Sequence, residues 1–330
     1  MSRATATSRL PAQLRNLRMP VIGSPMFTVS YPALVLAQCK AGIVGSFPAL
    51  NAREPALLDE WLHQLTESLA SFRAAHPGMP VGPIAVNQIS HDSNVRLEQD
   101  VQTCVKHRVP IIISSLRAPV PEIVDAVHAY GGIILHDVVS IRHAEKALKA
   151  GVDGLIAVAC GAGGHAGRMS PFALVGELRR MYAGPIALSG SIATGQAVLA
   201  ARVMGADFAY MGTRFIASQE ANASDDYKAA LLRASGADIV YSNWFSGVHG
   251  NYLRESIERA GLDPDDLPEG DKTRMSFADG RSKPKTWKDI WGAGQGVGQI
   301  DDFPAVAVIV ERLADEYAAA RALAAWRSDL

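Results

Sequence analysis

Short apolar runs recur along the first two thirds of this chain, and they constrain its fold more than any other feature. Each run is rich in β-branched residues, is bounded by Gly or Pro, and has the length of a buried parallel strand. Eight such runs occur, at residues 21–26, 43–47, 81–89, 110–116, 132–137, 154–159, 185–190 and 208–213. The interval between consecutive runs leaves room for a helix, so the sequence predicts repeated strand and helix units.

Helical segments are expected between the runs, for example at residues 54–75, 122–129, 141–149, 171–181 and 195–204. Several segments end alike, in Lys149-Ala150-Gly151 and in Val203-Met204-Gly205. Glycine just past a helix adopts the left-handed conformation that turns the chain into the next strand. Eight units completed before about residue 220 predict an α/β protein with a TIM (β/α)8 barrel.

The pattern breaks after Ser218. Residues 221–303 are polar and irregular, with Asp-Pro-Asp-Asp at 263–266 and Lys-Pro-Lys at 283–285, and we expect a smaller, mostly helical inserted domain that caps one end of the barrel. The Ala-rich run at residues 306–326 has apolar residues at helical spacing and is expected to pack back on the barrel. The expected division is a barrel domain of residues 1–220 plus 304–330 and a capping domain of residues 221–303.

Charge and cysteine content exclude several function classes. A formal net charge of −1 gives no broad attraction to nucleic acid or to an anionic membrane, so a small ligand is expected. The 3 cysteines form no C-x-x-C pair, which argues against a disulfide scaffold and fits a reducing compartment. The first 18 residues carry arginines without an apolar secretion signal, so we expect a frayed N-terminus of a cytoplasmic protein. No apolar run is long enough to span a membrane, and a homodimer is left open.

Ligands of such barrels bind at the C-terminal ends of the strands. The residues expected there are Ser24, Pro25, Met26 and Phe27 after the first strand, Asn87 and Gln88 after the third, and His136 and Asp137 after the fifth. Small residues and hydroxyls follow the last two strands, in Ser189-Gly190-Ser191 and Met211-Gly212-Thr213. Loops at these two places commonly hold phosphate, so we expect a phosphate-bearing cofactor.

A glycine-rich loop with one histidine follows the sixth strand, in Ala-Cys-Gly-Ala-Gly-Gly-His-Ala-Gly at residues 159–167. The loop is open to two interpretations: a flexible surface segment, or a close backbone approach to a ligand with His165 as a proton-transfer group. The expected position of the loop at the barrel mouth favours the second interpretation, a close approach to a ligand. Cys160 is better explained as a small apolar filler than as a nucleophile. His136, Asp137 and His165 could converge on a metal, but no metal is expected.

A second glycine-rich loop occupies residues 289–298. It does not join a strand to a helix as a dinucleotide-binding fingerprint requires. We interpret it as a loop that closes over a flat ring system, with Gln295 as a hydrogen-bonding group, and an ordinary linker is the alternative.

Taken together, these motifs resemble those of the nitronate monooxygenase family, formerly called 2-nitropropane dioxygenases. The resemblance covers nearly the whole chain and is most specific in Ala162-Gly163-Gly164-His165-x-Gly167 followed by Met211-Gly212-Thr213-Arg214-Phe215. Pro25-Met26, the third strand at 83–87, the segment at 142–153, Ser189-Gly190 and Ala293-Gly294-Gln295 also match.

The resemblance implies an FMN-dependent barrel that oxidises alkyl nitronates with O2 to a carbonyl compound and nitrite. It implies that His165 faces the substrate and acts as the base on a neutral nitroalkane. The expected FMN contacts are Pro25, Met26, Phe27, Asn87, His136, Asp137, Ala159, Gly163, Gly164, Ser189, Gly190, Ser191, Met211, Gly212, Thr213 and Gln295.

Two departures from the family pattern concern the substrate more than the flavin. Some relatives have lysine where this chain has Asp137, close to the pyrimidine edge of the flavin. The first-strand glycines of many members are replaced by Phe27-Thr28, which narrows the expected pocket. Two other functions remain open: an NAD(P)H-dependent flavin reductase of quinones or enoyl thioesters, and a non-redox phosphate-binding barrel lyase or isomerase.

Overall fold

A barrel of eight parallel strands forms the centre of the molecule. The computed structural model describes residues 10–270 and 288–326. The strands are β1 (Val21–Gly23), β2 (Gly45–Pro48), β3 (Ile84–Ser90), β4 (Ile111–Leu116), β5 (Ile133–Val138), β6 (Gly154–Val158), β8 (Ile186–Ser189) and β9 (Phe208–Met211). They pair in the order β1-β9-β8-β6-β5-β4-β3-β2, and a parallel bridge between Ile22 and Val44 joins the two ends. Each of the eight apolar runs is therefore a barrel strand, and the predicted TIM barrel is confirmed.

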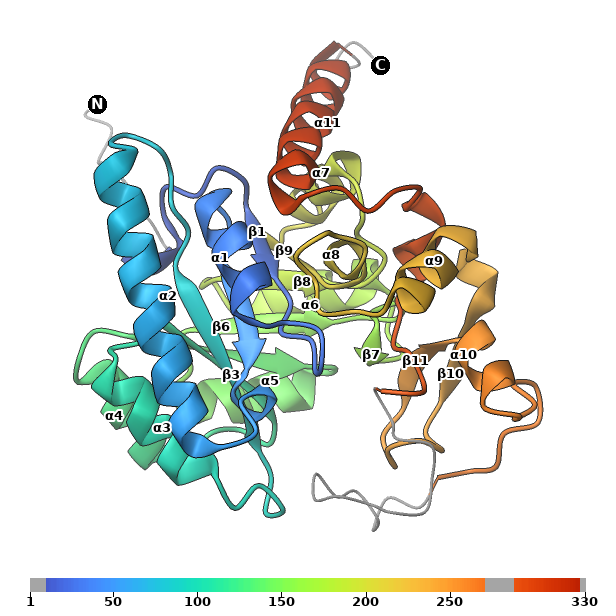
Figure 1. Cartoon of the computed structure of the whole chain (residues 1–330), viewed down its shortest axis with the longest axis horizontal. Coiled ribbons are helices and arrows are strands. Elements are labelled where there is room, and N and C mark those ends of the chain that lie inside the picture. The colour runs from blue at the N-terminus through green and yellow to red at the C-terminus, as the bar shows by residue number, and fades with distance from the viewer. Residues whose placement is uncertain (1–9, 271–287, 327–330) are drawn as a thin grey trace.

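Helices surround the barrel (Figure 1). They are α1 (Pro32–Lys40), α2 (Pro55–Ala75), α3 (Leu97–Lys106), α4 (Pro121–His128), α5 (Ile141–Lys149), α6 (Pro171–Met181), α7 (Gly195–Val203) and the short α8 (Thr213–Ile216). Proline opens several of them, and Ser140, Ser170 and Thr194 cap α5, α6 and α7 through their hydroxyls. Gly151 and Gly205 follow α5 and α7 with positive φ, as the sequence predicted.

Side chains of the strands alternate between two apolar layers. Ile111, Ile113 and Ile156 point into the barrel with Phe208, whereas Ile112 and Ile134 pack outward against the helices. The interior is filled, so a ligand can reach only the mouth of the barrel.

Residues after α8 form a smaller unit beside that mouth. It contains α9 (Asp225–Arg233), η3 (Gly236–Asp238), β10 (Ile239–Ser242), β11 (Gly250–Leu253), α10 (Arg254–Arg259) and η5 (Gln295–Gln299). The sequence predicted helices here, and the structure adds a small antiparallel sheet of order β10-β11-β7. Its third strand, β7 (Gly164–His165), comes from the glycine-rich loop of the barrel.

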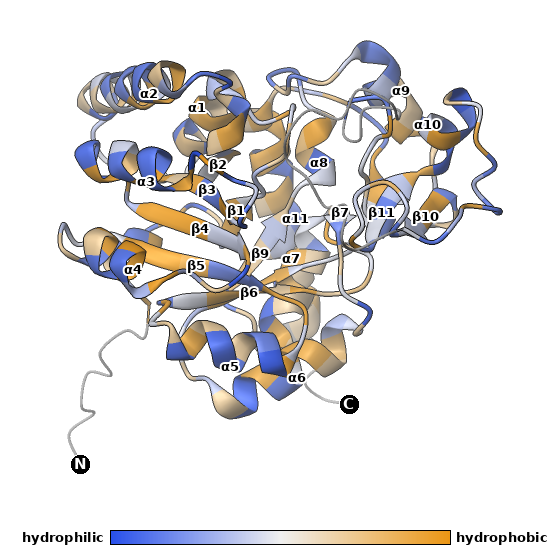
Figure 2. Cartoon of the chain, turned by 90° about the horizontal axis from the view of Figure 1, so that it is seen from below, coloured by the Kyte–Doolittle hydropathy of each residue, from blue (hydrophilic) through white to orange (hydrophobic). Residues whose placement is uncertain are grey.

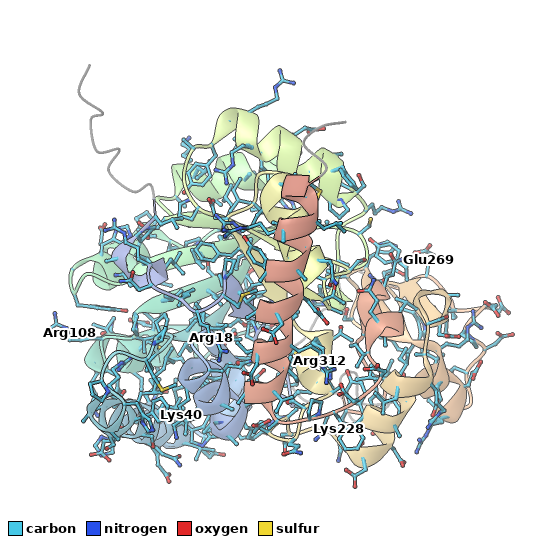
Figure 3. The ribbon with its side chains drawn as sticks, turned by 90° about the horizontal axis from the view of Figure 1, so that it is seen from above. Arg18, Lys40, Arg108, Lys228, Glu269 and Arg312 are labelled. Atoms are coloured by element: carbon cyan, nitrogen blue, oxygen red, sulfur yellow. The ribbon has the colours of Figure 1, made fainter. Side chains whose placement is uncertain are left out.

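The last helix, α11 (Val306–Trp326), returns to the barrel and packs on α7, as expected. Gly195 lies against it so closely that its backbone N–H donates to Glu316 at 2.6 Å. Figure 3 looks down on α11 and shows Arg312 on it, and this side chain pairs with Asp302 at 2.7 Å.

The expected frayed N-terminus at residues 1–9 and the Lys-Pro-Lys run lie outside the described residues. Within the described part, no helix combines the length and apolar character needed to cross a membrane.

Candidate active site

A cavity of about 400 Å³ opens at the C-terminal ends of the barrel strands. In Figure 2, β4 and β5 change from hydrophobic to hydrophilic toward their tips, where they reach this mouth. Most of the predicted site residues line the cavity: Pro25, Met26, Phe27, Asn87, Asp137, Gly163, Gly164, His165, Ser189, Gly190, Ser191, Gly212 and Thr213. The fold therefore brings together residues from six strand ends.

Four of the expected FMN contacts lie outside the cavity wall. Successive side chains of β5 point to opposite faces, so Asp137 faces the cavity and the His136 ring faces the helices. There, Ser114 Oγ lies 2.7 Å from His136 Nδ1. Burial lowers the pKa of His136 to about 4. Ala159 and Met211 are buried in the layers between strands and helices.

Gln295, the fourth of these, is exposed on η5. Its backbone N–H donates to Gly161 O at 2.9 Å, so Gln295 supports the glycine-rich loop from outside.

His165 is held in place by the smaller unit. Gly250 of β11 pairs with His165 in antiparallel register, and Asn251 Nδ2 donates to Ala162 O at 2.7 Å. His165 Nε2 lies 2.9 Å from Ser246 Oγ. Burial lowers the pKa of His165 to about 4, so the imidazole is neutral at physiological pH. Two residues of the glycine-rich loop, Gly164 and His165, thus form a paired strand at the cavity, which favours the interpretation of the loop as part of the site.

Three glycine-containing loops meet at one side of the cavity. Gly161 O accepts hydrogen bonds from the N–H groups of Ser191 and Gln295. Gly161, Gly190 and Ser191 all have positive φ, the left-handed conformation that lets these loops turn sharply at the cavity. A Cβ on Gly190 would lie 2.8 Å from Cys160 O, and one on Gly163 would lie 2.9 Å from Gly294 N. Glycine is required here because the loops approach too closely for any side chain.

The loop after β1 forms another wall. Asn51 Nδ2 donates to Met26 O at 3.1 Å and to Ser30 O at 2.8 Å, while Asn51 Oδ1 accepts from Thr28 N. These bonds hold Met26 and Phe27 at the cavity. The Arg53 guanidinium lies over the Phe27 ring, 5.0 Å from its centroid, a cation–π contact that orients the ring.

Three polar side chains near the ends of β3, β4 and β5 form a chain of hydrogen bonds. Asn87 Nδ2 donates to Ser115 Oγ at 2.7 Å, and Ser115 Oγ donates to Asp137 Oδ2 at 2.6 Å. The other carboxylate oxygen, Asp137 Oδ1, is buried without a hydrogen-bond partner among the described residues. Burial raises the pKa of Asp137 to about 6, against the opposing effect of the Ser115 hydrogen bond.

Ser115, His143 and Ser246 were not identified as site residues from the sequence. Ser115 lies near the end of β4 and bonds to Asn87 and Asp137. A polar residue near the end of an apolar strand is a signal that sequence reasoning could have used. His143 begins α5 with its backbone N–H bonded to Ser140 Oγ, as expected of a helix start, but its side chain lines the cavity. No sequence pattern around Ser246 indicates its role, because that role depends on a contact with His165, 81 residues away in the chain.

No group of three or more His, Cys, Asp or Glu side chains is placed to hold a metal ion in the described segments. Cys160 is partly buried beside the cavity loops.

Glycine loops, apolar walls and a polar edge thus line one cavity at the mouth of the barrel, where barrels of this type bind their ligands.

Comparisons with known proteins identify the family. Residues 83–316 match the family described as nitronate monooxygenase. A probable nitronate monooxygenase from Staphylococcus aureus (strain Newman) is 25% identical over 77% of this chain and 81% of that protein. The match to the family extends over more than half of the chain, so the protein is a flavin-dependent oxidoreductase. It belongs to the nitronate monooxygenase family.

Solved structures share the fold. Nitroalkane oxidase from Streptomyces ansochromogenes has a TM-score of 0.75 at 21% identity, covering 93% of this chain and 98% of that one. FabK from Thermotoga maritima has a TM-score of 0.73 at 24% identity, covering 96% and 97%. At these identities the two structures establish the barrel and do not define the reaction.

Proposed function

We propose that this protein binds FMN and oxidises alkyl nitronates, or the parent nitroalkanes, with O2 to a carbonyl compound and nitrite. The observation that carries the proposal is His165, a neutral imidazole held by β11 and Ser246 at the wall of the cavity. A neutral imidazole is the form that can remove a proton from a nitroalkane carbon.

The residues at the cavity fit FMN. Ser189, Gly190, Ser191, Gly212 and Thr213 would hold the phosphate. Asn87 and Asp137 would face the polar edge of the ring, and Asp137 Oδ1 needs a partner that the protein does not supply. When bound, the flavin would accept two electrons from the carbanion-like nitronate and pass them to O2.

Ser246 would set the proton-accepting nitrogen of His165. Its hydroxyl has one proton and lies 3.0 Å from Val248 O. With that proton donated to the carbonyl, Ser246 Oγ would accept from His165 Nε2–H and so fix the tautomer of the ring. The capping unit, for which we propose the bounds 221–303, thus orients the base as well as covering the barrel.

The cavity wall also selects the substrate. Leu50, Ile89, Leu116 and Val139 form an apolar part of the lining, and no lysine or arginine lines it in the segments that the structure describes. A small nitro compound with an apolar alkyl chain would pack against this part of the wall.

Replacing the base tests the proposal. His165→Asn should retain FMN but lose most turnover of a neutral nitroalkane, by about 100-fold or more, while turnover of the preformed nitronate falls much less. His63→Asn, on the exposed face of α2 beside Glu67, is the control and should match the native protein.

Equal losses on both substrates would contradict the role of His165 as the base. A yellow protein that releases no nitrite and is bleached by NADH or NADPH would favour the flavin reductase. A colourless protein would favour a non-redox enzyme.

A further inference from the structure

Asp137 is a buried acid whose hydrogen bonding is incomplete. It ends β5 and lines the cavity. One carboxylate oxygen accepts the Ser115 proton, and Oδ1 has no partner among the described residues. A carboxylate has about four acceptor positions, so a single donor leaves a buried charge poorly stabilised.

The hydrogen-bond chain behind Asp137 has a fixed direction. The Asn87 amide donates to Ile113 O at 3.0 Å and to Ser115 Oγ at 2.7 Å. The Ser115 hydroxyl has one proton, and it donates this proton to Asp137. The chain cannot relay a proton away from Asp137, so the carboxyl can gain or lose one only on the side of the cavity.

The groups that face Asp137 from neighbouring elements add no positive charge. Ile156 pairs with it from β6 and is apolar. Tyr210 on β9 is buried, and both its burial and the nearby Asp137 hold its pKa well above the usual range, so it stays neutral.

Two histidines also line the cavity. His165 on β7 is neutral because burial lowers its pKa. His143 lies on α5, where its side chain is exposed. The negative charge of the Asp137 carboxylate is therefore removed only when the carboxylate binds a proton.

Resting on the proposed FMN site, we propose that Asp137 is a proton-uptake residue: it gains a proton from solvent as the bound flavin is reduced. Two-electron reduction of a bound flavin by the reductant would bring one proton and leave a negative charge in the cavity. Asp137 takes a second proton from solvent on its unpartnered Oδ1 and becomes a neutral acid. Two protons are thus gained for two electrons, and no second negative charge accumulates in the cavity.

Burial supports this assignment, because it raises the pKa of Asp137 to about 6 before any charge arrives on the ring. A new negative charge nearby raises that pKa further. By binding a proton, Asp137 would therefore offset the negative charge of the reduced ring, as a fixed cation would.

The dependence of the flavin reduction potential on pH tests the proposal. Each proton gained in a two-electron reduction lowers the potential by about 30 mV per pH unit. Anaerobic titration with dithionite between about pH 7 and pH 8 should give about twice the slope in the native protein that it gives in Asp137→Asn. The control is Asp100→Asn on α3, which removes another buried acid with an unpartnered oxygen but lies away from the cavity and should keep the native slope.

Infrared difference spectra of the native protein give a readout that needs no variant. Reduction at pH 7.5 should produce a protonated-carboxyl band, and reduction at pH 5 should not, because the acid is then already protonated. Equal slopes in the native protein and Asp137→Asn, or no new band at pH 7.5, would overturn the proposal. If the purified protein holds no flavin, the proposed function itself fails, which is a separate result.

Discussion

At the scale of single residues, the site is defined by two half-buried titratable groups whose pKa values shift in opposite directions. Burial lowers the pKa of His165 to about 4 and raises that of Asp137 to about 6. Both shifts favour the neutral form, as expected where a group is removed from water without a charged partner. Near neutral pH His165 is therefore neutral and Asp137 is an anion, and two predictions follow from the individual groups.

The first concerns the acid side of the pH profile. Because only neutral His165 can accept a proton, kcat/KM for a neutral nitroalkane should persist well below pH 6 and fall with a midpoint near pH 4. The profile is best measured in Asp137→Asn, where no carboxyl titrates near pH 6. A midpoint near the ordinary histidine value of about 6.5 would show that His165 is not the titrating base.

The second concerns stability. The pKa of Asp137 is higher in the folded state than in the unfolded chain, so folding favours the protonated acid. Stability is greatest below the ordinary pKa of about 4 and declines as pH rises to about 6, by at most about 3 kcal/mol. Asp137→Asn should thus raise Tm at pH 8 and leave it unchanged at pH 4. The same change in Tm at both values would contradict the assigned shift.

At the scale of elements, the sequence predicts the barrel strands well and the small sheet poorly. The eight barrel strands are continuous apolar runs between glycines and prolines, so local composition identifies them. β7 has two residues, Gly164 and His165, and no periodicity can be read from two residues. Its pairing with β11 depends on contacts across the chain.

The same reasoning explains which site residues were misplaced. In a run as uniformly apolar as β5, the inward and outward faces are not distinguishable from sequence, so His136 and Asp137 were assigned together. Only the fold shows that Asp137 faces the cavity and His136 faces the helices.

The pairing of β11 with β7 should control catalysis without affecting the flavin site. A Cβ at Gly250 would lie 2.9 Å from Gly164 O, so Gly250→Ala should separate the strands and displace His165. We expect turnover of a nitroalkane to fall at least about tenfold with flavin content unchanged. Gly176→Ala on α6, where a Cβ meets no atom within 4 Å, is the matched control. Native activity in Gly250→Ala would show that β11 does not position the base.

At the scale of the whole molecule, one apolar core joins the barrel, the capping unit and the last helix. α11 packs on α7 through Gly195, and a Cβ there would lie 2.3 Å from Leu313 O. Gly195→Ala should therefore destabilise the fold by about 1–3 kcal/mol, the usual cost of overpacking. Thermal unfolding measures the change, with Gly176→Ala again as the control. An unchanged Tm would mean that α11 adapts without loss.

The most direct test of the central claim is nitrite release by the purified protein when a nitronate is added under air. The account predicts a yellow protein that carries FMN and forms nitrite and a carbonyl compound together in catalytic amounts. A flavin-containing protein that forms no nitrite from any small alkyl nitronate would contradict it.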